Sequence, residues 1–160
     1  LINIIYQLNY KYLNKTNNIF YGNGRHSSNF RLFENNYSIL KKMEDDLIII
    51  MEQAVKSDIF IIDSFFNVLS NGGGSNWHNH TNAWDDVHNL NKQKYSLTYH
   101  IAIGDQKSNE PGILKFKDPE EEILPSKGMV MIFPASRSHS AFYNGKVDRV
   151  MIGVNFYSLI

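Results

Sequence analysis

The chain has 160 residues, of which 42% are hydrophobic and 13% aromatic, which is enough for one well-packed core and too short for two ordinary domains. Its 16 basic and 16 acidic side chains cancel, and no cluster of Lys and Arg provides the electrostatic footprint of a nucleic-acid-binding protein. Because cysteine is absent, disulfides, thiolate-bound zinc and a cysteine nucleophile are excluded. We expect a single domain whose partner is a small molecule or a peptide.

The N-terminal part of the chain has little regular pattern. Its opening, LINIIYQLNYKYL, is apolar only in short runs, and it lacks both a basic leader and a small-residue cleavage site. We therefore expect no membrane association and a cytoplasmic location. Residues 1–36 show no sustained period, so we expect residues 1–57 to form a helical and irregular support for a core made by residues 58–160.

One helix is expected from Tyr37 to Ser57. Apolar residues recur there at spacings of three and four, which places them in a single stripe along a helix. The stripe consists of Leu40, Met43, Leu47, Ile50, Met51 and Ala54.

After this helix the sequence changes to short runs of β-branched and aromatic residues between clusters of Gly, Pro, Asn and Asp, which is the pattern of a β-sheet. We expect strands at roughly residues 58–70, 77–80, 95–103, 112–116, 128–133, 139–143 and 148–157. A series of this length is typical of a small barrel or sandwich. The sequence therefore predicts a mostly β fold with N-terminal helices.

Two of the expected strands have one polar face. In DRVMIGVNFY, one face carries Val150, Ile152, Val154 and Phe156. The opposite face carries Arg149, Met151, Gly153, Asn155 and Tyr157. In YSLTYHIAI, the polar face carries Ser96, Thr98 and His100. We expect the apolar face of residues 148–157 to pack on the helix and the polar faces of both strands to line one interior.

The six histidines are His26, His78, His80, His88, His100 and His139. A lone histidine is usually a surface residue or a hydrogen-bonded core residue, and we interpret His26 and His88 in this way. The pair in SNWHNHTNAWDD differs, because an i, i+2 spacing on a strand sends both imidazoles to one face, where they can reach one metal ion. The zinc-hydrolase pattern His-x-His-x-Asp-His is excluded, since Asn82 and Ala83 occupy its last two positions. A further ligand must come from elsewhere in the chain, and His139, after MVMIFPASRS, is the candidate.

The order of these motifs resembles a subgroup of the iron(II)/2-oxoglutarate-dependent oxygenases that carries a His-x-His pair. The matching elements are His78 and His80, SLTYHI, PGILKFKDP, PSKG, MIFPAS, His139, and RVMIGVNF beginning at Arg149. The resemblance covers about residues 58–158, and the ordered set is more specific than any one of its motifs. It implies a double-stranded β-helix, a jelly-roll or cupin-like barrel.

The resemblance also implies a metal centre for Fe(II). Most members of the wider superfamily have His-x-Asp or His-x-Glu, whereas this chain has His80 at the carboxylate position. We expect His78, His80 and His139 to bind the metal. Asp85 or Asp86, in the loop that follows, is the alternative third ligand.

The implied co-substrates are 2-oxoglutarate and O2, and the implied products are succinate, carbon dioxide and a hydroxylated substrate. Arg149 suits the far carboxylate of 2-oxoglutarate, because a guanidinium offers a bidentate fork. Its alternative role is an ordinary ion pair with Asp148 or Asp118. Further candidates for co-substrate contacts are Asn155, Tyr99, Thr98 and Ser96. Candidates for the substrate pocket are Trp77, Trp84 and His100.

Two other functions remain open from the sequence. A cupin-like metalloprotein, a dioxygenase or isomerase with three histidines on the metal and no 2-oxoglutarate, explains His80 without difficulty but gives Arg149 no task. A non-catalytic ligand-binding barrel, in which the histidines bind zinc or nothing, is the third possibility.

Overall fold

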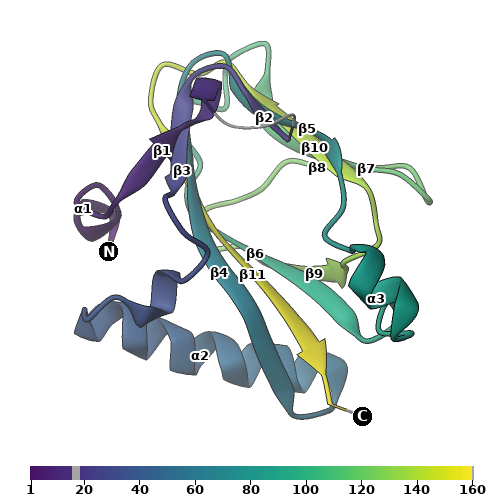
Figure 1. Ribbon diagram of the computed structural model, residues 1–160. Coiled ribbons are helices and arrows are strands. Elements are labelled where there is room, and N and C mark those ends of the chain that lie inside the picture. Colours follow the sequence, from purple (N-terminus) through teal and green to yellow (C-terminus); the bar gives the residue numbers. More distant parts are fainter. Residues whose placement is uncertain (16–18, 160) are drawn as a thin grey trace.

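Two antiparallel β-sheets face each other in this computed structural model, which describes residues 1–15 and 19–159 (Figure 1). One sheet has the strand order β1-β3-β4-β11-β6-β9, and the other has the order β2-β5-β10-β7-β8. From β4 onward the chain passes between the sheets at nearly every connection. This is the winding of the double-stranded β-helix that the family resemblance implied.

The six-stranded sheet consists of β1 (Tyr10–Tyr12), β3 (Gly24–Ser27), β4 (Ile59–Leu69), β11 (Arg149–Ser158), β6 (Lys94–Ala102) and β9 (Val130–Pro134). The five-stranded sheet consists of β2 (Phe20–Tyr21), β5 (Gly73–His78), β10 (His139–Tyr143), β7 (Pro111–Phe116) and β8 (Glu121–Ile123). The helices are α1 (Ile2–Ile5), α2 (Ser38–Val55), α3 (Ala83–Val87) and 3-10 turns at Leu13–Lys15 and Leu32–Glu34.

Helix α2 covers the outer face of the six-stranded sheet (Figure 1). Its buried residues are Leu40, Met43, Leu47 and Met51. They share one core with the apolar face of β11, that is, with Val150, Ile152, Val154 and Phe156. Ile50 and Ala54, assigned to the same stripe from the sequence, are exposed at its margin. The prediction for β11 holds, and its other face is left to line the space between the sheets.

Strand β5 begins earlier than the sequence pattern suggested and ends at His78 rather than at residue 80. Its glycines disguised it, because Gly-rich segments normally indicate turns. Here glycine allows close backbone approach. A Cβ at Gly74 would lie 2.6 Å from the Tyr21 hydroxyl and 2.7 Å from the Ala141 carbonyl oxygen.

The N-terminal region contributes more than irregular support. Strands β1 and β3 extend the six-stranded sheet beside β4, and β2 pairs with β5 at the edge of the other sheet. These strands have two to four residues each, too short to show an alternating pattern. No helix in the described part of the chain is long and apolar enough to cross a lipid bilayer.

Candidate metal centre

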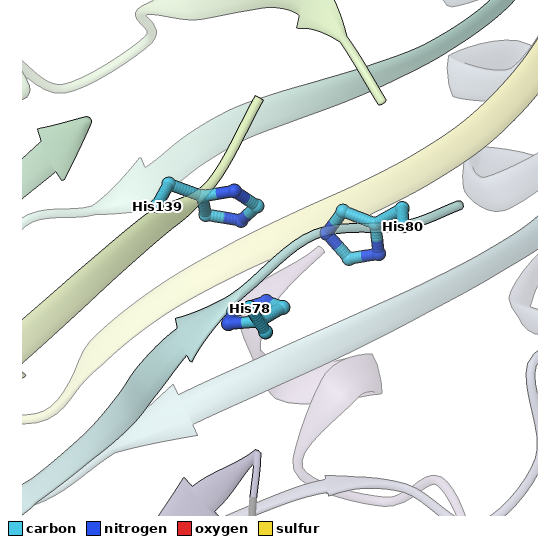
Figure 2. A group of neighbouring side chains, drawn as sticks. All are labelled: His78, His80 and His139. Carbon is cyan, nitrogen blue, oxygen red and sulfur yellow. The ribbon is translucent and has the colours of Figure 1, made fainter. Parts of the chain in front are cut away.

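Three histidines meet at one end of the five-stranded sheet. His78 is the last residue of β5, His139 is the first residue of β10, and the two are cross-strand partners with ring centroids 4.3 Å apart. The His80 ring centroid lies 5.1 Å from each of the other two. The potential ligand nitrogens of the three side chains all lie within 4.8 Å of one another, and Figure 2 shows the rings gathered around one space.

His80 reaches this group by a different route from the one expected. It lies beyond the end of β5, so the i, i+2 geometry of a single strand does not place it. Its backbone N–H instead donates to the Ala135 carbonyl at 2.8 Å, which holds the loop after β5 against the segment after β9. The loop contact, rather than strand periodicity, therefore brings His80 to the cluster.

Hydrogen bonds prepare two of the imidazoles to bind a metal. The Nδ1 atom of His78 lies 2.6 Å from the Asn76 carbonyl oxygen, and the Nδ1 atom of His139 lies 3.2 Å from the Arg137 carbonyl oxygen. A carbonyl only accepts, so each Nδ1 carries the proton and each Nε2 presents a lone pair to the centre. This arrangement fits a divalent transition metal such as Fe(II), for which imidazole is a suitable ligand.

The three imidazoles are neutral at pH 7. Burial, together with the neighbouring imidazoles, lowers the pKa of His80 to about 2 and that of His139 to about 4. Burial also lowers the pKa of His78. Since a metal binds only the unprotonated imidazole, no proton has to be displaced at neutral pH.

The alternative third ligands from the sequence, Asp85 and Asp86, do not join the cluster. Asn82 and Asp85 form a capping box at the start of α3, and the Asp85 carboxylate also accepts from Lys94 Nζ at 2.8 Å and from the Tyr157 hydroxyl. Burial alone would raise the pKa of Asp85, but these donors outweigh it and the pKa is lowered. Asp86 faces outward and accepts from the Asn91 side chain. The alternative of an acidic third ligand from this loop has no support in the geometry.

Arg149 lies at the other end of the cavity and is buried. Its Nη1 donates to the Gly112 carbonyl, and its Nη2 lies 3.4 Å from His100 Nδ1. Burial lowers the pKa of Arg149 to about 10, so the guanidinium remains charged at neutral pH. Among the described residues no carboxylate forms an ion pair with it. Asp148, the partner considered from the sequence, instead accepts from Ser70 at 2.8 Å and from Tyr6.

His100 orients this arginine. Burial and the charge on Arg149 together lower the pKa of His100 to about 3. The neutral ring therefore accepts from Arg149 at Nδ1 and carries its proton on Nε2, which lies 3.3 Å from Thr98 Oγ1. Thr98, His100 and Arg149 form one hydrogen-bonded wall of the cavity.

A second polar group lies beside His80. Ser96 Oγ donates to Asn155 Oδ1 at 2.7 Å, and Asn155 Nδ2 donates to Asp63 Oδ1 at 2.8 Å. The same Nδ2 atom lies 3.4 Å from His80 Nδ1. Asn155 is thereby held between the three histidines and the carboxylate of Asp63, a residue that the sequence analysis did not single out.

These groups line one cavity of about 350 Å³, a size typical of small-molecule sites. Its lining includes the three histidines, Arg149, His100, Thr98, Ser96 and Asn155. Three expected residues lie elsewhere. Tyr99 faces the helix-side core, Trp77 is 45% exposed under Lys117, and Trp84 is 65% exposed against His88. The strand alternation explains Tyr99, whose neighbours Thr98 and His100 occupy the cavity face.

The sequence analysis missed the cavity wall formed by β4. Asp63, Phe65 and Asn67 alternate along that strand and face inward. The signal was a pair of polar residues, Asp63 and Asn67, at alternate positions of a largely apolar run, IIDSFFNVL. Phe30, from the segment before α2, packs edge-on against Phe65 with ring centroids 5.5 Å apart and completes this wall.

No family model matches the sequence, and no curated protein is similar to it in sequence. Solved structures do match the fold. A prolyl hydroxylase from Trichoplax adhaerens, bound to a hypoxia inducible factor peptide, is 11% identical with a TM-score of 0.69, covering 98% of this chain and 74% of its own. An oxidoreductase of the 2OG-Fe(II) oxygenase family from Burkholderia pseudomallei is 11% identical with a TM-score of 0.66, covering 98% and 76%. The chain has the fold of the 2OG-Fe(II) oxygenases.

The fold is also similar to that of a structure outside the oxygenases. A predicted oxalate decarboxylase from Thermotoga maritima is 13% identical with a TM-score of 0.51, and the match covers 96% of both chains. The resemblance inferred from the sequence motifs is thus confirmed at the level of the fold. At these identities the likeness carries the architecture, and function is argued from the residues in the cavity.

Proposed function

We propose that the chain is a non-haem iron(II)- and 2-oxoglutarate-dependent oxygenase that hydroxylates a small molecule or a peptide. The observation that carries this proposal is the buried guanidinium of Arg149, which shares a cavity with three neutral imidazoles and has no carboxylate partner in the described part of the chain. A buried charge is costly unless it is paired. A dicarboxylate that reaches from the histidines to Arg149 satisfies both groups at once.

Each residue has a definite task in this proposal. His78, His80 and His139 would hold the metal, and Arg149 would bind the far carboxylate of 2-oxoglutarate. His100, neutral and hydrogen-bonded to Thr98, keeps the guanidinium in place without competing for its charge. When bound, iron(II) and 2-oxoglutarate would activate O2 for hydroxylation, so that one oxygen atom enters the substrate and the other enters succinate, with release of carbon dioxide.

The absence of a carboxylate among the three histidines has an electrostatic consequence. Three neutral ligands leave both positive charges of the metal uncompensated, whereas 2-oxoglutarate brings two negative charges. Metal and co-substrate should therefore strengthen each other's binding, and by linkage the factor is the same in both directions.

A cupin-type metal enzyme without 2-oxoglutarate is the second candidate. The three-histidine cluster and the likeness to the predicted oxalate decarboxylase support it. An enzyme of this type would have no ligand for Arg149, which Thr98 and His100 hold in place. The state of Arg149 therefore separates the two candidates.

The test is an anaerobic titration of 2-oxoglutarate into the protein loaded with Mn(II) or Fe(II). We expect saturable binding, and we expect Arg149→Ala to raise the Kd more than about tenfold, since truncating one member of a desolvated charge pair typically costs about 2–5 kcal/mol. Metal affinity in the absence of 2-oxoglutarate should stay nearly unchanged in that variant. An unchanged 2-oxoglutarate titration favours the cupin-type enzyme.

A complementary measurement is succinate production by the purified protein with Fe(II), ascorbate, 2-oxoglutarate and O2, with no other substrate added. Slow production that disappears in Arg149→Ala supports the proposal. This reaction needs no knowledge of the primary substrate.

A further inference from the structure

Asp63 and Arg149 lie at opposite ends of the same cavity. In the pairing of β4 with β11, Asp63 is opposite Asn155, whereas Arg149 is opposite Leu69. Six residues of extended strand separate positions 149 and 155, which corresponds to about 20 Å. Asn155 also contacts His80, so Asp63 lies on the side of the histidine cluster that faces away from Arg149. The two ends thus carry opposite charges.

Asp63 is a largely buried carboxylate without a cation of its own. Its Oδ1 accepts from Asn155 Nδ2 at 2.8 Å, and within the described ranges it forms no ion pair. Lys94 lines the same cavity, but its ammonium is bound to Asp85 at 2.8 Å, and both of these side chains are almost completely buried. Burial raises the pKa of Asp63 to about 6 despite the hydrogen bond from Asn155 and the charge on Lys94.

The cavity wall beside Asp63 is apolar and open. Phe30 is 49% exposed and Ile62 is 36% exposed, and both line the cavity. Phe65 lies between these two residues and the three histidines, with its ring centroid 6.3 Å from that of His80. A ligand entering here meets an apolar surface, with one carboxylate beside it and the histidines beyond.

We propose that Asp63 recognises a positively charged amine nitrogen of the primary substrate. The apolar part of that substrate would pack against Phe30 and Phe65, beside the three histidines. The amine would replace the cation that the carboxylate lacks, because a buried charge is stabilised by an opposite charge and by hydrogen bonds. The aromatic wall adds favourable contacts for a cationic group close to a ring face. The proposal rests on the proposed function in one respect: the molecule whose amine Asp63 would hold is the substrate that the oxygenase would oxidise.

The experiment compares three probes that share a phenyl ring and a short chain: 2-phenylethylammonium, 2-phenylethanol and 3-phenylpropionate. Binding to the protein loaded with Mn(II) and 2-oxoglutarate is followed by proton relaxation of the probe, because a probe beside the metal is broadened by the paramagnetic ion. We expect the ammonium to bind at least about tenfold more tightly than the alcohol, and the carboxylate more weakly than both. Failure of the ammonium to bind at millimolar concentration, or equal affinity for ammonium and alcohol, overturns the proposal.

The diagnostic variant is Asp63→Asn, which removes the charge but keeps an oxygen that can accept from Asn155. We expect it to raise the Kd for 2-phenylethylammonium at least about tenfold while its Kd for 2-oxoglutarate stays as in the wild type. The matched control is Asp58→Asn, which removes an exposed carboxylate just before β4 and should change neither value. The proposal is overturned if Asp63→Asn weakens binding of both 2-phenylethylammonium and 2-oxoglutarate, or of neither.

The outcome is distinguishable from a failure of the proposed function. Binding of 2-phenylethylammonium and 2-phenylethanol to the metal-free protein, followed by amide chemical shifts, needs neither the metal nor 2-oxoglutarate. A preference for the ammonium that depends on Asp63 supports the amine site even if 2-oxoglutarate does not bind. Conversely, 2-oxoglutarate binding that depends on Arg149 supports the oxygenase even if binding of the ammonium does not depend on Asp63.

Discussion

Gly112 and Arg149 are in close contact in the wall of the cavity. The Gly112 carbonyl accepts from Arg149 Nη1, and its Cα carries no side chain on the face against which the guanidinium lies. A Cβ built at Gly112 would overlap Arg149 Nη1, and the backbone there has φ +85°. The glycine of β7 therefore helps to position the Arg149 guanidinium, although it presents only backbone to it.

The first prediction concerns this pair. Gly112→Ala should displace the Arg149 guanidinium and raise the Kd for 2-oxoglutarate about tenfold or more, with little change in metal affinity. The matched control is Gly128→Ala, because Gly128 has nearly the same φ of +84° but no atom within 4 Å of the position of a Cβ. Both variants carry the strain of a left-handed alanine, about 1–2 kcal/mol. Equal co-substrate affinities in the two variants would contradict the prediction.

The second prediction separates the metal ligands from the aspartates of α3. His80→Ala should weaken anaerobic Fe(II) binding by at least about tenfold, a typical effect for loss of a metal-site interaction. Asp85→Ala should leave Fe(II) affinity nearly unchanged but lower the free energy of unfolding by about 3–5 kcal/mol, because it strands the buried ammonium of Lys94. Asp86→Ala should change neither quantity. Loss of the metal in an aspartate variant, with retention in His80→Ala, would show that the three-histidine assignment is wrong.

Much of the fold after residue 58 could be predicted because its strands alternate between two environments. The chain from Arg149 to Ser158 faces a helix on one side and a polar cavity on the other, so its period of two is visible in the sequence. Strand β10 has the bounds that the pattern indicated. In contrast, β5 is rich in glycine, and glycine in a sequence does not reveal whether it serves a turn or a close approach.

Less of the cavity could be predicted, because part of it depends on loops and on pairing between distant segments. The position of His80 is set by a backbone hydrogen bond to Ala135, and no local pattern encodes that contact. The role of Asp63 depends on its pairing with Asn155, which is far away in the sequence. Phe30 joins the cavity only because its segment crosses beside β4, where its carbonyl accepts from the Ser64 backbone N–H.

The third prediction is that the metal-free protein loses stability in mild acid. The pKa values of His80, His100 and His139 are lowered in the folded state to about 2, 3 and 4. Below about pH 6.5 the unfolded chain binds protons that the folded chain cannot, so stability is complete above that pH and falls as the pH decreases toward 4. Urea unfolding at a series of pH values measures the effect, and His139→Gln should reduce the slope. A slope that is the same in that variant would show that His139 is already protonated in the folded state.

The last prediction is that Asp63→Asn stabilises the protein at neutral pH and not in acid. The pKa of Asp63 is raised to about 6 in the folded state, above its ordinary value near 3.8, so the folded chain holds this proton more tightly than the unfolded chain does. The contribution of Asp63 to stability therefore decreases as the pH rises from about 4 to 6, and above pH 6 the buried charge costs up to roughly 3 kcal/mol.

Asparagine removes that cost and can still accept from Asn155, so the free energy of unfolding should rise by about 1–2 kcal/mol at pH 7.5 and stay near the wild-type value at pH 4. Urea unfolding of both proteins at the two pH values, without metal or ligand, provides the measurement. If Asp63 served only to hold Asn155 in place, the variant would be less stable than the wild type or equal to it at both pH values. A ligand-binding carboxylate, in contrast, is expected to lower the stability of the ligand-free protein at neutral pH, because its partner is absent. Strained or desolvated groups of this kind are retained for function at the expense of stability.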